Sequence, residues 1–131
     1  MALEMVILTP LLLLLLALLF AYGRAAQANS TLQAGVRDAA RSASQARNAV
    51  DARTRAEAVI RAALGPGATG CQNSLQLDPI RFQLDVPVTV TARCSYPLND
   101  LGLPGAPGSI TASATFASPL DPNRGLDVDA P

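Results

Sequence analysis

Three parts of the chain show three different patterns of hydrophobic and polar residues. Residues 5–22 form an apolar run without a charge. Residues 24–64 are rich in Ala, Arg, Gln and Ser, and their apolar positions recur every three or four residues, as on one helical face. Between residues 86 and 96 apolar and polar residues alternate, which is typical of a half-buried strand. The patterns predict an α+β protein, with a long N-terminal helix followed by a small antiparallel sheet.

The apolar run is long enough to cross a membrane. Its 18 residues would extend about 27 Å as a helix, close to the hydrocarbon thickness of roughly 30 Å. A cleaved signal peptide is the alternative. The length of the run, the absence of a preceding Lys or Arg, and its continuation into a helical pattern favour a retained helix.

Two residues of this segment are unusual for a plain anchor. Glu4 would place a carboxylate at the edge of the hydrocarbon, where it is costly unless it is paired. Either it touches water at the interface, or it needs a cationic partner such as the N-terminal ammonium of a neighbouring chain. Pro10 removes one backbone hydrogen bond and is expected to kink the helix about one turn below.

The second pattern predicts a helical arm that ends at the helix stop Gly65-Pro66-Gly67. If this helix continues from the membrane without a break, the arm is about 60 Å long. Its apolar face either packs on the chain's own small domain or packs against other chains. The residues of this candidate packing face are Leu32, Val36, Ala39, Ala43, Ala46 and Val50.

After residue 68 the content of Pro, Gly, Asp and Thr rises. Strands are expected at residues 81–85, 86–96 and 109–117, with a Pro/Gly-rich surface loop at 97–108. The sheet is expected to pack on the C-terminal half of the long helix. The expected organisation is a membrane helix at 1–24, a helical arm at 25–64, a β module at 65–118 and a frayed tail at 119–131.

The two cysteines, Cys71 and Cys94, are 23 positions apart. A disulfide between them would tie helix to sheet and contribute roughly 3 kcal/mol; two free buried thiols are the alternative. A disulfide implies an oxidising, extracytoplasmic compartment. The Arg residues that follow the apolar run favour the opposite orientation. A basic leader upstream of Met1 would resolve this conflict.

Composition narrows the function classes. The formal net charge is zero, with ten cations that are all Arg, so a basic nucleic-acid binder is not expected. The chain has no His, which excludes Ser-His-Asp and Cys-His nucleophiles, and two Cys alone do not make a zinc site. We therefore expect no enzyme activity, no metal and no cofactor.

The order of these features gives a pilin-like layout. The N-terminal part resembles the TadE-like pseudopilin family of the tight-adherence (Flp) pilus system, because Glu4 matches the family glutamate and Pro10 its early proline. Gly23-Arg24 matches the Gly-Arg end of the family segment. Residues 3–26 carry this resemblance, and the remainder is similar to actinobacterial members.

The resemblance implies a non-enzymatic role in pilus assembly. Glu4 would pair with the N-terminal ammonium of an adjacent subunit, and the partners would be the membrane, other pilins or pseudopilins and the assembly machinery. A prepilin peptidase is implied if a leader precedes Met1. The C-terminal part would be extracytoplasmic, on a single-pass anchor. A membrane-anchored extracytoplasmic binding module unrelated to pili is the alternative.

Overall fold

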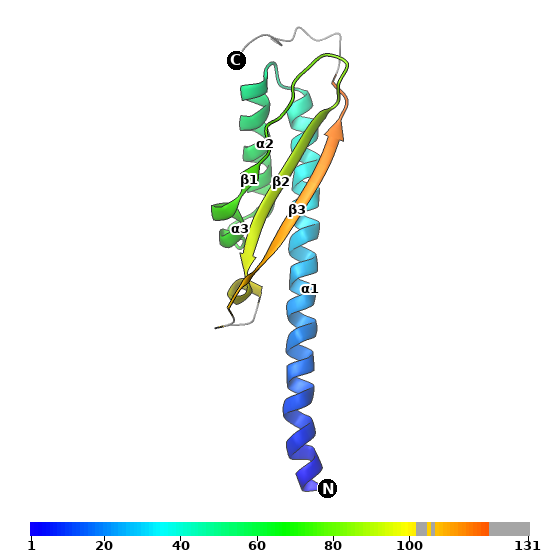
Figure 1. Ribbon diagram of the computed structural model, residues 1–131, viewed down its shortest axis with the longest axis vertical. Coiled ribbons are helices and arrows are strands. Elements are labelled where there is room, and N and C mark those ends of the chain that lie inside the picture. The colour runs from blue at the N-terminus through cyan, green and yellow to red at the C-terminus, as the bar shows by residue number, and fades with distance from the viewer. Residues whose placement is uncertain (102–104, 106, 121–131) are drawn as a thin grey trace.

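The structure, a computed structural model, describes residues 1–101, 105 and 107–120. One long helix, α1 (Ala2–Ser44), runs the length of the molecule (Figure 1). Its 43 residues correspond to about 65 Å at 1.5 Å per residue. Residues 2–22, here called the apolar half of α1, project as a stalk, and residues 23–44, the packed half, carry the rest of the protein.

The second helix, α2 (Ala49–Leu64), folds back beside α1 (Figure 1). The expectation of one uninterrupted helix to residue 64 is therefore wrong, and no 60 Å arm forms. At the start of α2 the side chain of Asn48 accepts a hydrogen bond from the Asp51 N–H at 2.8 Å. This N-cap satisfies a backbone donor that a new helix would otherwise leave unpaired. The fold-back lets two Ala-rich helix faces cover each other instead of facing water.

The two helices approach closely where α1 carries a glycine. A Cβ added at Gly35 would lie 3.0 Å from the Ala63 Cβ, so only glycine fits without displacing α2. At the end of α2, Gly65 adopts φ +71°, a left-handed conformation that favours glycine and stops the helix.

Three strands form an antiparallel sheet in the order β1-β2-β3. A short helix, α3 (Thr69–Ser74), leads into β1 (Gln76–Leu77), and β2 (Val88–Pro97) pairs along its length with β3 (Ser109–Ser118). The 3-10 turn η1 (Leu98–Leu101) follows β2. The expected combination of a long N-terminal helix, a small antiparallel sheet and one disulfide is confirmed.

The sheet differs from expectation in its first strand. Residues 81–85 form no strand; β1 pairs with β2 instead, at Arg93 and Ala92. The segment between β1 and β2 instead sends Phe82 into the core and turns at Asp85, whose φ is 65°. Part of the expected 97–108 loop is η1, and residues 102–104 and 106 lie outside the described residues, as does the expected tail beyond residue 120.

The core lies between the packed half of α1, α2 and the inner face of the sheet, and β2 and β3 contact α1 directly. Alanine is its commonest residue type, so the core is thin, as the composition predicts. The largest fully buried side chains are Leu32, Ile60, Val36, Val88, Val90 and Cys71.

Candidate functional site: the apolar half of α1 and its junction with the sheet

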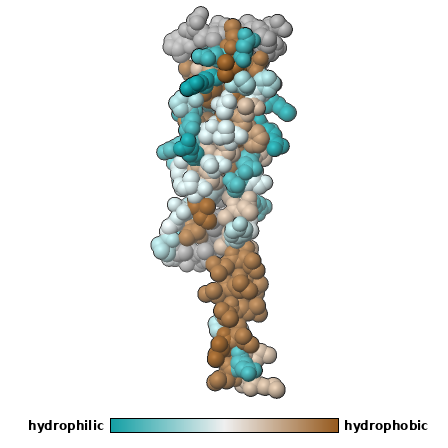
Figure 2. Space-filling view, turned by 45° about the vertical axis from the view of Figure 1, so that its right-hand side comes forward, coloured by the Kyte–Doolittle hydropathy of each residue, from teal (hydrophilic) through white to brown (hydrophobic). Residues whose placement is uncertain are grey.

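The apolar half of α1 is exposed to an extent that a soluble protein would not tolerate. Leu13, at its centre, is 60% exposed, and its apolar neighbours before and after it are exposed to a similar degree. By length and composition this helix is able to cross a membrane. Figure 2 shows the stalk as an almost continuous apolar surface, distinct from the mixed surface above it. That surface belongs to the packed half of α1 and to the module, the name used here for α2, α3, η1 and the three strands together.

Polar groups mark both ends of this surface. Glu4 lies in the first turn of α1 and is exposed, between the exposed Leu3 and Met5. At the other end the guanidinium of Arg24 lies 5.9 Å from the centre of the Phe20 ring. An aromatic ring and a cation at this position suit the boundary between lipid and water.

α1 continues through Pro10 without interruption. One residue earlier, the Thr9 hydroxyl donates to the Met5 carbonyl at 2.6 Å. The carbonyl that loses its helical donor at Pro10 is that of Val6, four residues before the proline. The kink expected at Pro10 stays a prediction.

The candidate packing face lies inside the protein. Leu32, Val36, Ala39, Ala43 and Ala46 are buried in the chain's own core. Val50 is separated from them by the turn between α1 and α2 and is 59% exposed. The face therefore packs on the chain's own small domain, which is one of the two alternatives for this helix. The large exposed apolar surface of α1 is then its apolar half.

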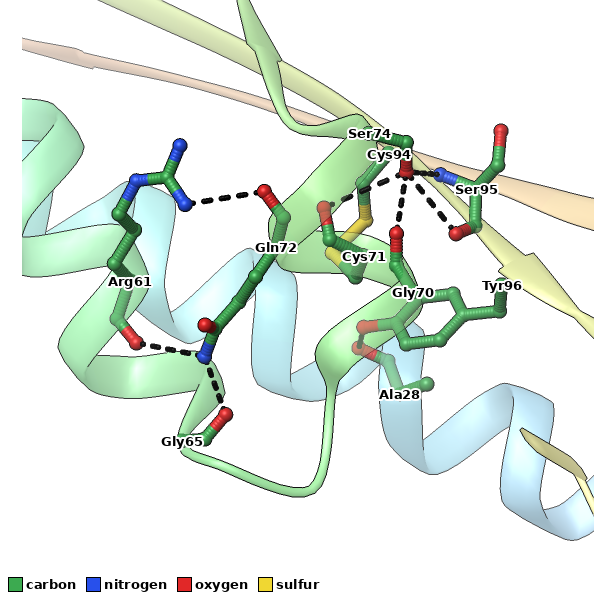
Figure 3. The surroundings of a disulfide bond; sticks show 10 residues. All are labelled: Ala28, Arg61, Gly65, Gly70, Cys71, Gln72, Ser74, Cys94, Ser95 and Tyr96. Carbon is green, nitrogen blue, oxygen red and sulfur yellow. Dashed lines mark hydrogen bonds between the residues drawn. A yellow bond between two sulfur atoms is a disulfide. The ribbon is translucent and has the colours of Figure 1, made fainter.

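The two cysteines form a disulfide that fastens α3 to the centre of β2 (Figure 3). Both are almost completely buried. Next to the bridge, the Ser74 hydroxyl donates to the Gly70 carbonyl at 2.7 Å and accepts the Ser95 N–H at 2.8 Å. This hydroxyl therefore joins α3 to β2 a second time, a role that the sequence pattern did not indicate.

Hydrogen bonds extend from the disulfide to α2 (Figure 3). The Gln72 side chain donates to the carbonyl of Gly65, and Arg61 donates from Nη1 to the Gln72 carbonyl at 3.1 Å. The C-terminal end of α2 is thus hydrogen-bonded to α3, and α3 is joined to β2 by the disulfide.

Tyr96 marks the junction between the module and the stalk. Its hydroxyl donates to the carbonyl of Ala28 on α1 at 3.5 Å (Figure 3). Burial raises the pKa of this phenol above its usual value, so it stays neutral and available as a donor. A groove of about 330 Å³ that includes Arg24 opens on one side of Tyr96, and one of about 440 Å³ that includes Tyr22 opens on the other.

No group of three or more His, Cys, Asp or Glu side chains gathers into a potential metal site among the residues that the structure describes. The chemistry of the candidate site is therefore that of apolar surface, one carboxylate and an interfacial cation.

The fold and this surface define a class: a small disulfide-linked α+β module carried on a helix that is able to span a membrane. A family model described as TadE-like protein matches residues 1–41. The match covers the whole apolar half of α1, with Glu4 and Pro10, and most of the packed half, so the resemblance is confirmed for this N-terminal part. No curated protein and no solved structure matches the chain.

Proposed function

We propose that the chain is a non-enzymatic pseudopilin or minor pilin of a tight-adherence (Flp type) pilus or a related secretion apparatus. This proposal rests mainly on one observation: the TadE-like match covers the exposed apolar half of α1, which contains both Glu4 and Pro10. In this proposal residues 5–22 anchor the protein in the membrane, and the rest of the chain takes part in pilus assembly.

The disulfide supports an orientation with the module outside the cytoplasm. Buried disulfides form and persist in oxidising compartments, and Cys71–Cys94 ties together the core of the module. The N-terminus with Glu4 then lies at the cytoplasmic side of the membrane. A basic leader that keeps this end in the cytoplasm, and a prepilin peptidase that removes it, belong to the same proposal.

Glu4 is proposed as the subunit-pairing acid. Its neighbours Leu3 and Met5 are apolar and exposed, so in a bilayer the carboxylate would lie at the edge of the hydrocarbon. The ammonium at the N-terminus of an adjacent subunit is a partner that would remove the cost of leaving this charge unpaired. Because the core face from Leu32 to Ala46 is already covered, we assign contacts between subunits to the apolar half of α1.

The test is the N-terminal sequence of the protein recovered from membranes of its native host. A mature chain that begins one residue before Met1, or is otherwise cut just ahead of Glu4, is expected, because prepilin processing leaves the acid near the new N-terminus. A start at Met1 or Ala2 would mean that no leader is cleaved and would favour a simple anchored surface module. A mature start near Ala25 would show that the apolar segment is a removed signal peptide and would overturn the proposal.

Glu4→Gln and Glu57→Gln form a matched pair of variants for the pilus role. Glu57 lies on α2 with its side chain 41% exposed, and it pairs with Arg61 at 3.0 Å. We expect Glu4→Gln to reduce the amount of protein in sheared pilus fractions while membrane levels stay unchanged, and Glu57→Gln to behave as wild type. Equal recovery of both variants in those fractions would favour an anchored binding module unrelated to pili.

A further inference from the structure

The lower end of the module reaches down beside the stalk. In Figure 1, β2 runs toward the N-terminal end of α1, and β3 starts there and runs back. η1, between them, contacts α1. Within residues 5–22, all of which the structure describes, Ala21 is the one buried residue, at 8% exposure. The module therefore covers α1 down to the last turn of the apolar run.

This position corresponds to a defined depth in a bilayer. If residues 5–22 span the hydrocarbon, about 27 Å of helix fills about 30 Å of apolar thickness. Ala21 and Tyr22 then lie at its outer edge, where tyrosine is enriched. Whatever lies beside them in the module must lie at the depth of the lipid head groups.

Two large apolar side chains, those of Tyr22 and Ile110, are exposed at this depth. Ile110 faces the same side of β3 as Ala112 and Ala114, which are buried, yet Ile110 itself is 41% exposed. It lies opposite Tyr96 in the strand register and lines the groove of about 440 Å³ with Tyr22, which is 79% exposed. In Figure 2 apolar surface appears on the lower part of the module, above the apolar stalk.

We propose that the surface formed by Tyr22 and Ile110, here called the base surface, rests in the head-group layer of the membrane. It would be a second lipid contact, in addition to the span by α1. The base surface adjoins the end of the anchor, where lipid is the surrounding medium, and Arg24 lies where a cation meets lipid phosphates. The inference rests on the membrane anchoring proposed above.

A second contact has a mechanical consequence. α1 passes from the apolar half into the packed half without a break. Anchor and module therefore move together, and a single membrane helix alone would leave the whole protein free to tilt and to rotate about the helix axis. With the base surface held in the head groups, the sheet keeps one orientation to the membrane, which would present the same face to each incoming subunit.

The test uses tryptophan reporters, because the full chain contains no Trp. Ile110→Trp places the reporter on the base surface. Ser109→Trp, at an exposed neighbouring position, repeats the measurement without disturbing the apolar face. Val50→Trp, at the far end of the module, and Phe20→Trp, inside the anchor, are the controls. Each full-length variant is reconstituted in phosphatidylcholine vesicles with brominated acyl chains and titrated with iodide.

We expect bromolipid to quench Phe20→Trp most strongly, Ile110→Trp and Ser109→Trp in part, and Val50→Trp not at all, while iodide quenches Val50→Trp most strongly. Quenching of Phe20→Trp by bromolipid, with both base reporters untouched by bromolipid and as open to iodide as Val50→Trp, would overturn the inference and leave the anchor intact. Base reporters shielded from both quenchers would mean that a protein neighbour covers the surface, which also overturns it. Failure of Phe20→Trp to respond would overturn the anchoring itself.

Discussion

The two halves of α1 belong to one continuous helix but differ in what surrounds them. In the apolar half the side chains are large and exposed, as at Leu13, with 60% exposure. In the packed half most inward side chains are small, and the few large ones, such as Leu32 at 0%, are enclosed by the chain's own core. Hydrophobicity alone therefore does not tell which surface the protein covers by itself.

Side-chain size explains the division. Alanines allow α2 and the sheet to come close to α1, and close packing makes up for the small area that each alanine buries. Leucines in the other half stay exposed among the residues that the structure describes, and a bilayer or the helices of other subunits would cover them. The same helix thus belongs to the protein core at one end and exposes its apolar side chains at the other.

The largest effect is expected from the same substitution made once in each half. Leu32→Ala should lower the free energy of unfolding by about 2–5 kcal/mol, because it leaves a cavity in a thin core. Leu13→Ala should leave it unchanged. The measurement is urea unfolding of the full chain in detergent micelles, followed by circular dichroism. Equal losses for the two variants would contradict the division of the helix.

Much of this division could be predicted from the sequence. The apolar run, the alternation of β2 and β3, and the use of both cysteines all follow from local patterns. The break between α1 and α2 could not, because residues 45–48 contain neither Pro nor Gly. It depends on the Asn48 cap and on burial of Ala46, which are visible only once the two helices lie side by side.

The candidate site shows the same limit. Glu4 and Pro10 were recognisable because they interrupt an apolar pattern. Tyr96 and Ile110 stood in predicted strands as ordinary inward-facing residues. They lie beside the end of the apolar half because β2 and β3 extend that far along α1. This extent depends on how the sheet packs on the helix, which local sequence patterns do not show.

The second-largest effect is expected when an arginine is introduced into each half of α1 in turn and membrane insertion is measured. Leu13→Arg should oppose membrane insertion by about 3 kcal/mol, since an arginine at the centre of a membrane helix costs roughly that much. Ala34→Arg, at an exposed position of the packed half, is the matched control and should insert normally. The measurement is the fraction of protein that resists extraction from membranes by alkaline carbonate. Normal membrane retention of Leu13→Arg would argue against the anchor.

A smaller effect distinguishes the two glycines of α1. Gly35→Val should destabilise the protein by about 1–3 kcal/mol, because the added atoms would overlap Ala63 on α2. No atom of the described residues lies within 4 Å of a Cβ added at Gly23, so Gly23→Val should cost nothing through packing. Thermal unfolding of both full-length variants in micelles measures the difference. Similar melting temperatures for the two would show that α1 and α2 are less tightly packed than the structure indicates.

The smallest effect is a pH dependence confined to the module. The Arg55 guanidinium, 3.0 Å from the Asp51 carboxylate, holds the pKa of that carboxyl below its ordinary value of 3.8. The unfolded chain therefore binds the proton more readily, and the stabilisation is present above about pH 4 and lost as the pH falls through the folded pKa. Because the pair is exposed, its contribution is small. Asp51→Asn and Arg55→Gln should each lower the melting temperature slightly at pH 7 and not at pH 2. A difference that persists at pH 2 would mean that these side chains act through helix formation in α2 and not through their charges.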